Sequence, residues 1–305
     1  MASPTGTMDA PFGRMLTAMV TPFTADGAVD YAAVCRLAAY LVDEQGNDGL
    51  IVSGTTGESP TTSDEEKTRI LEAVLETVGD RAMVIAGAGS NDTHHSIELA
   101  KAAERAGAHG LLVVTPYYNK PPQEGLYQHF TQVADATRLP VMLYDIPGRS
   151  GVPIASETLI RLAQHDRIVA VKDAKGDLFA AGQVMLATGL AFYSGDDLLN
   201  LAWLAVGAAG FVSVVGHVVG AELAQMIQLY RNNHAEQAQA IHRQLIPVVD
   251  GIMQRAGGAI MAKAALGLVG VPAGPVRLPL VEADDKQIAE LRACLVAGGV
   301  KLTDI

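Results

Sequence analysis

Short apolar runs alternate with longer amphipathic stretches between residues 16 and 213 of this chain. A run that is apolar throughout, without polar alternation, is typical of a strand buried on both faces of a parallel sheet. The pattern predicts eight such strands. They cover residues 16–20, 50–52, 83–86, 111–114, 141–144, 168–172, 191–194 and 211–213.

The stretches between these strands carry apolar residues at helical spacing and predict helices over 31–44, 64–78, 93–106, 124–136, 156–164, 178–188 and 198–206. Ser63 and Glu66 are expected to form a capping box ahead of the second helix. Gly49 and Gly110 each lie between a predicted helix and the next strand, where a helix C-cap is expected. Eight strand–helix units fit an α/β fold of the closed (β/α)8 type, the TIM barrel.

After Ser213 the pattern becomes helical only, with helices predicted over 222–232, 236–255, 259–268 and 285–297. We therefore expect a disordered N-terminal tail over residues 1–13, a barrel over 14–219 and a C-terminal helical extension over 220–305. An open, doubly wound sheet is the alternative fold. No GxGxxG follows the first strand, which argues against the dinucleotide-binding version of that sheet.

Charge and composition exclude several classes of function. The net charge is −11 and no stretch is rich in Lys or Arg, so nucleic acid is not an expected partner. No run approaches the roughly 18 apolar residues of a membrane span. The first residues lack the basic-then-apolar pattern of a signal peptide, so we expect a soluble, cytoplasmic protein. Cys35 and Cys294 match no metal or disulfide spacing and are expected to be reduced thiols.

Catalytic residues of a (β/α)8 barrel lie at the carboxyl ends of its strands. Four predicted strands end in residue types that bind substrates or catalyse reactions. These ends are Gly54-Thr55-Thr56-Gly57-Glu58, Thr115-Pro116-Tyr117-Tyr118, Tyr144-Asp145-Ile146-Pro147-Gly148-Arg149 and Lys172-Asp173. The site is expected where these four ends meet.

Lys172 is the strongest candidate among the eight lysines of the chain, because it directly follows a buried apolar strand. Desolvation there lowers a lysine pKa, and a partly neutral amine is able to attack a ketone. The structural alternative is an ion pair with Asp173 or with a carboxylate across the barrel. Lys175, beside a glycine, and Lys263, in a helix of small residues, are weaker candidates.

The other strand ends offer complementary groups. The Gly54–Gly57 segment is able to cradle a carboxylate with its amides and hydroxyls, or to form only a tight turn. Tyr144 is a candidate proton relay or a core aromatic residue. Arg149 is a candidate clamp for a second carboxylate or a partner in a surface ion pair. The histidines are scattered and HExxH is absent, so no metal site is expected.

Together these motifs resemble the dihydrodipicolinate synthases, within the pyruvate-dependent class I aldolases, over residues 14–300. The resemblance also rests on Thr21-Pro22-Phe23 and Ser194-Gly195-Asp196-Asp197. It implies condensation of pyruvate with L-aspartate 4-semialdehyde in diaminopimelate and lysine biosynthesis, without a cofactor, by a homotetramer. Open alternatives are another Schiff-base lyase, acting on a 2-keto-3-deoxy sugar acid or 4-hydroxy-2-oxoglutarate, and a non-catalytic barrel that senses metabolites.

The resemblance implies a role for each site residue. Lys172 would form the imine with pyruvate, and Thr56 would hold the pyruvate carboxylate. Tyr144, Thr55 and Tyr118 would relay protons, with Tyr118 supplied by a neighbouring subunit. Arg149 would bind the carboxylate of the aldehyde. The backbones of Gly195 and Val212 would line the pocket.

Two features depart from many relatives. Asp145 stands where many have Asn, and Asp173 where many have Glu. The resemblance also implies a lysine-binding regulatory set at Ser59, Asp64, Lys67, Asn91, His95 and Tyr117. Lysine-inhibited relatives tend to carry His or a carboxylate at the positions of Lys67 and His95. Cations there should repel the lysine ammonium, so weak or no feedback inhibition is expected.

Overall fold

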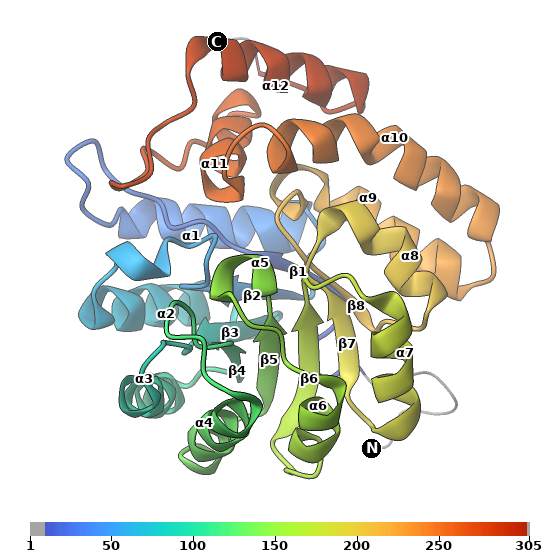
Figure 1. The fold of residues 1–305 in the computed structure, drawn as a ribbon. Helices are drawn as coiled ribbons and strands as arrows, with labels where there is room; N and C mark the ends of the chain where they lie inside the picture. The colour runs from blue at the N-terminus through green and yellow to red at the C-terminus, as the bar shows by residue number, and fades with distance from the viewer. Residues whose placement is uncertain (1–9, 304–305) are drawn as a thin grey trace.

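The computed structural model describes residues 10–303, which form a closed barrel of eight parallel strands in sequence order (Figure 1). The (β/α)8 prediction is confirmed. The strands are β1 Met15–Ala18, β2 Gly49–Val52, β3 Met83–Gly87, β4 Gly110–Val114, β5 Val141–Asp145, β6 Ile168–Asp173, β7 Ala191–Ser194 and β8 Gly210–Ser213.

Each predicted strand overlaps an observed one, and the ends differ by at most two residues. The largest difference is at β1, which was predicted to continue to residue 20 and ends at Ala18. The backbone amide of Val20 donates to Nε2 of the buried His217, 3.0 Å away, instead of to a neighbouring strand. A tertiary contact therefore ends this strand, and the local apolar pattern does not reveal it.

Helices follow the strands and surround the barrel. They are α1 Tyr31–Ala39, the π-helix η1 Tyr40–Glu44, the 3-10 helix η2 Ser59–Thr61, α2 Asp64–Val78, α3 Thr93–Ala106, α4 Gln123–Asp135, α5 Pro147–Ser150, α6 Ser156–Leu162, α7 Leu178–Ala187, the 3-10 helix η3 Asp197–Leu199, α8 Asn200–Ala205, α9 Gly216–Arg231, α10 Ala235–Met253, α11 Gly258–Leu268 and α12 Asp285–Ala297. Within the described chain, no helix has the length and apolar character needed to cross a bilayer.

The predicted capping box is confirmed, and the predicted glycine C-caps are wrong. The Ser63 hydroxyl accepts from the Glu66 amide at 3.1 Å, and the Ser63 amide donates to the Glu66 carboxylate at 2.8 Å. Gly49 and Gly110 lie inside β2 and β4. A Cβ atom at Gly110 would lie 2.4 Å from the Phe12 ring, so close packing requires this glycine. Gly107, with φ +89°, caps α3 instead.

The N-terminal ends of the strands are closed by residues that were predicted to be disordered. Residues 1–9 of the predicted tail lie outside the described residues, whereas Phe12 is 0% exposed and belongs to the cluster that fills the barrel. The Tyr193 hydroxyl, inside the barrel, donates to the Gly13 carbonyl at 2.9 Å. The prediction of a disordered tail is therefore wrong for residues 10–13, because Phe12 fills the base of the barrel.

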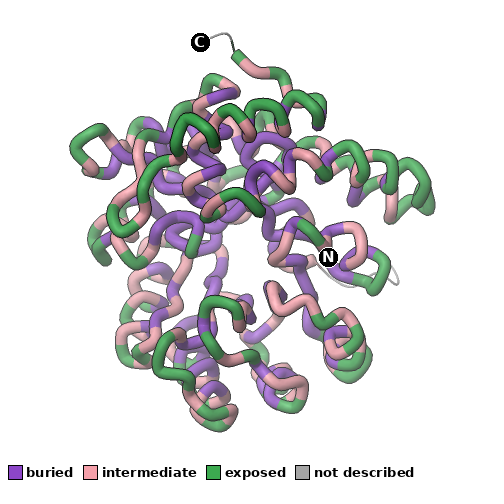
Figure 2. Tube along the Cα trace, turned by 45° about the horizontal axis from the view of Figure 1, so that its top comes forward, coloured by how far each residue is buried: buried purple, intermediate pink, exposed green. Residues whose placement is uncertain are grey.

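The predicted boundary between barrel and extension, at residues 219 and 220, falls inside α9. This helix begins at Gly216, six residues before the predicted start, and it packs against β1 and β8. We place the boundary after Arg231, which leaves α10, α11 and α12 as the extension on the side of α9 (Figure 1). Buried residues gather at the centre of the molecule, and exposed residues line the outer helices (Figure 2).

We predict that Phe12→Ala lowers the free energy of unfolding by about 3–5 kcal/mol, because it leaves a cavity at the base of the barrel. Phe12→Leu retains most of the buried volume and should cost only about 1 kcal/mol. Urea unfolding followed by circular dichroism measures both. Equal midpoints for Phe12→Ala and the unmodified protein would contradict a packing role for this residue.

Candidate active site

Lys172 lies near the carboxyl end of β6, with its side chain inside the barrel mouth. Its register neighbours are Tyr144 on β5 and Tyr193 on β7. The residue is only 4% exposed, and its Nζ atom lies 4.0 Å from the centroid of the Tyr144 ring. No carboxylate of residues 10–303 forms an ion pair with this amine, so the structural alternative for Lys172 is wrong.

Desolvation controls the charge of this amine. Burial lowers the pKa of Lys172 to about 7, the Arg149 charge acts in the same direction, and Asp197 opposes both. Near neutral pH a substantial fraction of the side chain is therefore neutral, which is the nucleophilic form.

Asp197 is a buried carboxylate near this amine. It accepts bonds from the Ser213 hydroxyl at 2.6 Å, the Asn200 side chain at 2.9 Å, and the backbone amides of Val214 and Val215 at 2.7 and 3.0 Å. These donors hold the carboxylate between η3 and the end of β8. Asp197 thus moderates the pKa of Lys172 through space without neutralising the amine as a salt-bridge partner.

The Tyr144 phenol is a potential proton donor beside the Lys172 amine. Burial raises the pKa of its phenol to about 12, while Arg149 and a hydrogen bond with Thr55 act in the opposite direction. The phenol is protonated at neutral pH and is able to donate a proton to a developing alkoxide. The structure therefore brings together Lys172, Tyr144 and Thr55, three of the four predicted catalytic residues.

A cavity of about 220 Å³ opens beside Tyr144 at the carboxyl ends of the strands. Lys172 and Thr56 are not among the residues that line it, but Tyr144, which contacts Lys172, is. The lining residues are Ser53, Gly54, Thr55, Ser59, Pro60, Gly87, Gly89, Leu112, Val114, Tyr117, Tyr144, Ile146, Arg149 and Ser150. The predicted clamp, Arg149, thus shares one cavity with Tyr144 and Thr55.

The loop after β2 carries the Gly54–Gly57 segment, which was predicted to cradle a carboxylate. Ser53 and Glu58, which flank the Gly54–Gly57 segment, both have left-handed backbones, with φ of 54° and 56°. Residues other than glycine are strained in this region and persist only where their surroundings hold them. The Thr21 hydroxyl donates to the Gly57 carbonyl at 2.7 Å and holds the turn from the β1 side.

Gly195 and Val212 are not among the residues that line the cavity, so their predicted place in the pocket wall stays a prediction. A Cβ atom at Gly195 would lie 2.9 Å from Cγ and 3.1 Å from Cε of Lys172, so a larger residue would displace the lysine side chain. Val212 is 1% exposed and belongs to the same interior cluster as Tyr144.

Tyr118 stands apart from these residues. It is 88% exposed with φ of 73°, and it is not among the residues that line the cavity of its own chain. A role in proton transfer would require this side chain to reach the site of another subunit, and that role stays a prediction.

The six predicted regulatory residues fall into separate groups. Ser59 and Tyr117 line the cavity. Asp64 lies 3.8 Å from Lys67 and 2.9 Å from His95, so one carboxylate contacts both predicted cations. The Asn91 carbonyl accepts from the Asn119 side chain at 2.8 Å.

Asp145 and Asp173 point away from the barrel interior, because their neighbours on the strands point inward. Burial raises the pKa of Asp145 to about 6, and Lys175, 3.3 Å away, opposes the shift. Burial also raises the pKa of Asp173, which accepts from the backbone amides of Lys175 and Gly176. Lys175 is therefore a structural cation behind the site.

Two buried charged groups have roles that were not predicted, although Lys263 was a weaker candidate for the nucleophile. Asp197 lay within a recognised motif, but no role was assigned to it. Lys263 forms a buried ion pair with Glu58 at 2.7 Å. A single charge in an otherwise apolar, small-residue helix is the sequence signal that points to such a pair.

Across residues 10–303, no three His, Cys, Asp or Glu side chains gather as metal ligands would. A (β/α)8 barrel with a buried lysine that is unpaired within the described chain, beside a protonated tyrosine, defines a class I aldolase-type lyase.

Comparison with known proteins identifies the family. The sequence profile of the Dihydrodipicolinate synthetase family matches residues 11–297, and the chain belongs to this family. It is 63% identical to 4-hydroxy-tetrahydrodipicolinate synthase 2 of Streptomyces coelicolor over 98% of this chain and 100% of that protein. It is also 63% identical to the 4-hydroxy-tetrahydrodipicolinate synthase of Acidothermus cellulolyticus over 95% of this chain and 94% of that one. The crystal structure of the enzyme from Cyanidioschyzon merolae with lysine bound superposes with a TM-score of 0.93, at 42% identity, over 96% of this chain and 100% of that one.

We predict that Lys172→Met stabilises the protein by roughly 2–4 kcal/mol at pH 6.5. The folded pKa of Lys172 is lowered, so the unfolded chain binds more protons above pH 7. The destabilisation caused by the buried ammonium is therefore full below pH 7. It fades as the pH rises toward the pKa of a free lysine. Urea unfolding at pH 6.5 and pH 9.5 measures the gain and its decline.

Lys175→Met is the matched control. It removes a cation that is paired with the buried Asp145, so it should destabilise the fold. A Lys172→Met protein no more stable than the unmodified one at pH 6.5 would argue against a desolvated amine.

Proposed function

We propose that this protein is a 4-hydroxy-tetrahydrodipicolinate synthase, which condenses pyruvate with L-aspartate 4-semialdehyde through an imine on Lys172. The observation that carries the proposal is the buried Lys172 amine, which forms no ion pair with a carboxylate of residues 10–303 and lies 4.0 Å from the centroid of the Tyr144 ring. The names of the close relatives support the choice of reaction.

The proposed first half-reaction activates pyruvate. The neutral Lys172 amine attacks the ketone carbon, and loss of water gives a protonated imine. This cation withdraws electrons from the adjacent methyl group, so one methyl proton leaves and an enamine forms. Lys172 supplies the electron sink, and no cofactor is required for this step.

The second half-reaction forms the new carbon–carbon bond. The enamine carbon attacks the aldehyde carbon of aspartate semialdehyde, and the aldehyde oxygen becomes an alkoxide. We propose that the Tyr144 phenol protonates it, and the Thr55 hydroxyl is hydrogen-bonded to that phenol. We propose that Tyr118 of a neighbouring subunit connects this relay to solvent. Attack on the regenerated imine by the product's own amine then frees Lys172.

Two groups account for the choice of substrates. The Gly54–Gly57 cradle, with Thr56, is proposed to hold the carboxylate of pyruvate. Arg149 lines the cavity and is proposed to grip the carboxylate of the aldehyde substrate, where its planar guanidinium forms two parallel hydrogen bonds. Gly195 leaves room for the lysine side chain, and the backbones of Gly195 and Val212 are proposed to line the pocket.

The alternatives receive less support. A lyase for a 2-keto-3-deoxy sugar acid handles an aldehyde without a carboxylate and would have no use for a guanidinium in the cavity. The close relatives also carry the name of the synthase. A sensor barrel without activity would not need an amine depressed to a pKa of about 7. We also propose a homotetramer that works in the cytoplasm, in diaminopimelate and lysine biosynthesis.

Reduction with borohydride in the presence of pyruvate tests the mechanism. The unmodified protein should gain the mass of the reduced pyruvate adduct on the peptide that contains Lys172, and Lys172→Ala should gain nothing. Arg149→Ala should still be trapped, while its turnover with aspartate semialdehyde falls by about 100-fold or more, because the clamp acts on the second substrate only. Full turnover by Arg149→Ala would refute the substrate assignment, and labelling of another lysine would refute the mechanism.

We further propose that feedback inhibition by lysine is weak or absent. Asp64 is already contacted by Lys67 and His95, and these side chains together offer little attraction to an ammonium ligand. Activity should persist when millimolar lysine is added, and Lys67→His should become more sensitive because it removes a positive charge. Strong inhibition of the unmodified protein by sub-millimolar lysine would overturn the proposal.

A further inference from the structure

Glu58 and Lys263 form a buried ion pair between the cradle loop and the C-terminal extension. The Lys263 Nζ atom lies 2.7 Å from Glu58 Oε1, and their side chains are 4% and 1% exposed. Lys263, in α11, also donates to the Pro275 carbonyl at 2.6 Å and lies 4.2 Å from the Phe23 ring centroid. The two charged residues are 205 positions apart in the chain.

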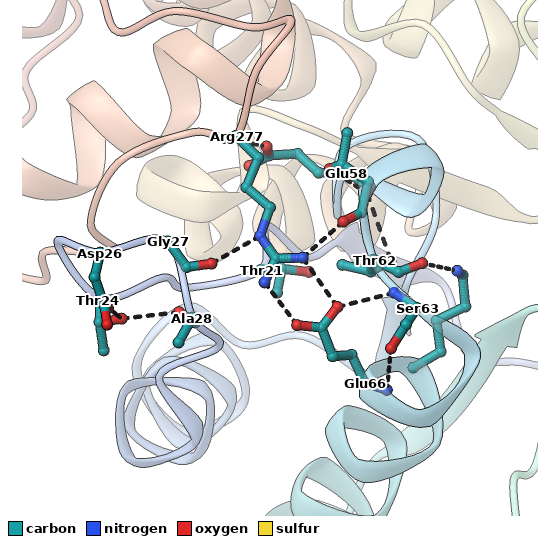
Figure 3. Close-up of polar contacts among 12 residues, drawn as sticks. Thr21, Thr24, Asp26, Gly27, Ala28, Glu58, Thr62, Ser63, Glu66 and Arg277 are labelled. Carbon is teal, nitrogen blue, oxygen red and sulfur yellow. Dashed lines mark hydrogen bonds and ion pairs between the residues drawn. The ribbon is translucent and has the colours of Figure 1, made fainter.

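The second oxygen of Glu58 is held by the segment that follows α11. The backbone amide of Arg277 donates to Glu58 Oε2 at 2.8 Å. The Arg277 guanidinium lies between the Gly27 carbonyl and the Glu66 carboxylate, with bonds of 2.8 and 2.6 Å, and Glu58 lies alongside (Figure 3). Both carboxylate oxygens of Glu58 are therefore anchored by the extension.

The backbone of Glu58 closes the turn of the Gly54–Gly57 cradle. Its amide donates to the Thr55 carbonyl at 3.1 Å, and the Ser59 amide donates to the Gly54 carbonyl at 3.2 Å. Glu58 adopts a left-handed conformation with φ of 56°, which a residue with a side chain rarely adopts unless it is held there. The Lys263 ammonium and the Arg277 amide hold its side chain, and both contacts constrain the turn that carries Thr55 and Thr56.

A buried ion pair is not an efficient way to stabilise a fold, because desolvation offsets most of the attraction. Apolar residues of similar size in the same place are often equally stabilising. A buried pair at the end of a functional loop is better explained by the geometry that it imposes.

We propose that Glu58 is a positioning residue for pyruvate: its pairing with Lys263 fixes the left-handed turn that aims Thr56 and the cradle amides at the substrate carboxylate. The C-terminal extension thereby determines the affinity of the barrel for the keto acid. This inference rests on the proposed function, since it assigns the cradle to the carboxylate of pyruvate.

Borohydride trapping at graded pyruvate concentrations tests the proposal with three variants. Glu58→Gln should raise the pyruvate concentration for half-maximal trapping by about tenfold, because small displacements of binding groups are costly. Trapping at saturating pyruvate should remain complete. In turnover assays the KM for pyruvate should rise, while the KM for aspartate semialdehyde stays unchanged because Arg149 lies on a different loop.

The double variant Glu58→Gln/Lys263→Met separates positioning from stability. Lys263→Met alone leaves a buried carboxylate without its cation and should lower the unfolding midpoint in urea. The double variant carries no unpaired charge and should recover much of that loss. Its affinity for pyruvate should remain as low as that of Glu58→Gln.

Glu66→Gln is the matched control. It weakens another ion pair of the extension, with Arg277, and leaves the Glu58–Lys263 contact in place. Its half-maximal pyruvate concentration should not change, even where its stability falls.

The outcomes are distinct. No trapping in the unmodified protein would overturn the proposed function, and this inference with it. Normal trapping there, together with an unchanged pyruvate response in Glu58→Gln, would overturn this inference alone. This inference is also overturned if the variants, Glu66→Gln included, lose pyruvate affinity in proportion to their loss of stability. The ion pair would then be only structural.

Discussion

The chemistry that we propose for this protein depends on an amine that is kept out of water. The barrel mouth encloses the Lys172 side chain, and burial brings its pKa to about 7. A lysine on the surface would be almost fully protonated at the same pH and would be a poor nucleophile. Burying an unpaired ammonium there destabilises the fold. The same desolvation lowers the pKa and leaves part of the amine neutral. The packing of the rest of the barrel, from Phe12 at its base upward, must compensate for it.

The neighbours of Lys172 modulate its charge without removing it. Asp197 lies close enough to raise the pKa, but its oxygens are occupied by the Ser213 hydroxyl, the Asn200 amide and two backbone amides. Asp173, the next residue on the strand, faces the opposite way. On the outer face of the strands, Lys175 pairs with Asp145. Asp173 and Lys175, the charged residues nearest to Lys172 in sequence, therefore have structural roles. The barrel thereby keeps a nucleophile between carboxylates that do not neutralise it.

The cradle loop and the extension show a second use of buried charge. Lys172, the proposed nucleophile, forms no ion pair within the described chain, whereas Lys263 is held by Glu58 and a carbonyl and serves as an anchor. Two lysines of similar burial thus have opposite roles, and the presence of a carboxylate within bonding distance decides which role each one takes.

The sequence by itself determined the eight strands, the order of the helices, the capping box at Ser63 and the placement of Lys172 at a strand end. Such features follow from local apolar periodicity and from short-range hydrogen bonding. Only the tertiary structure decided that Phe12 closes the barrel, that His217 ends β1, and that Lys263 reaches Glu58, 205 residues away. These contacts depend on how distant segments meet when the barrel closes. Desolvation and charge pairing are properties of that closed arrangement, and no local pattern records them.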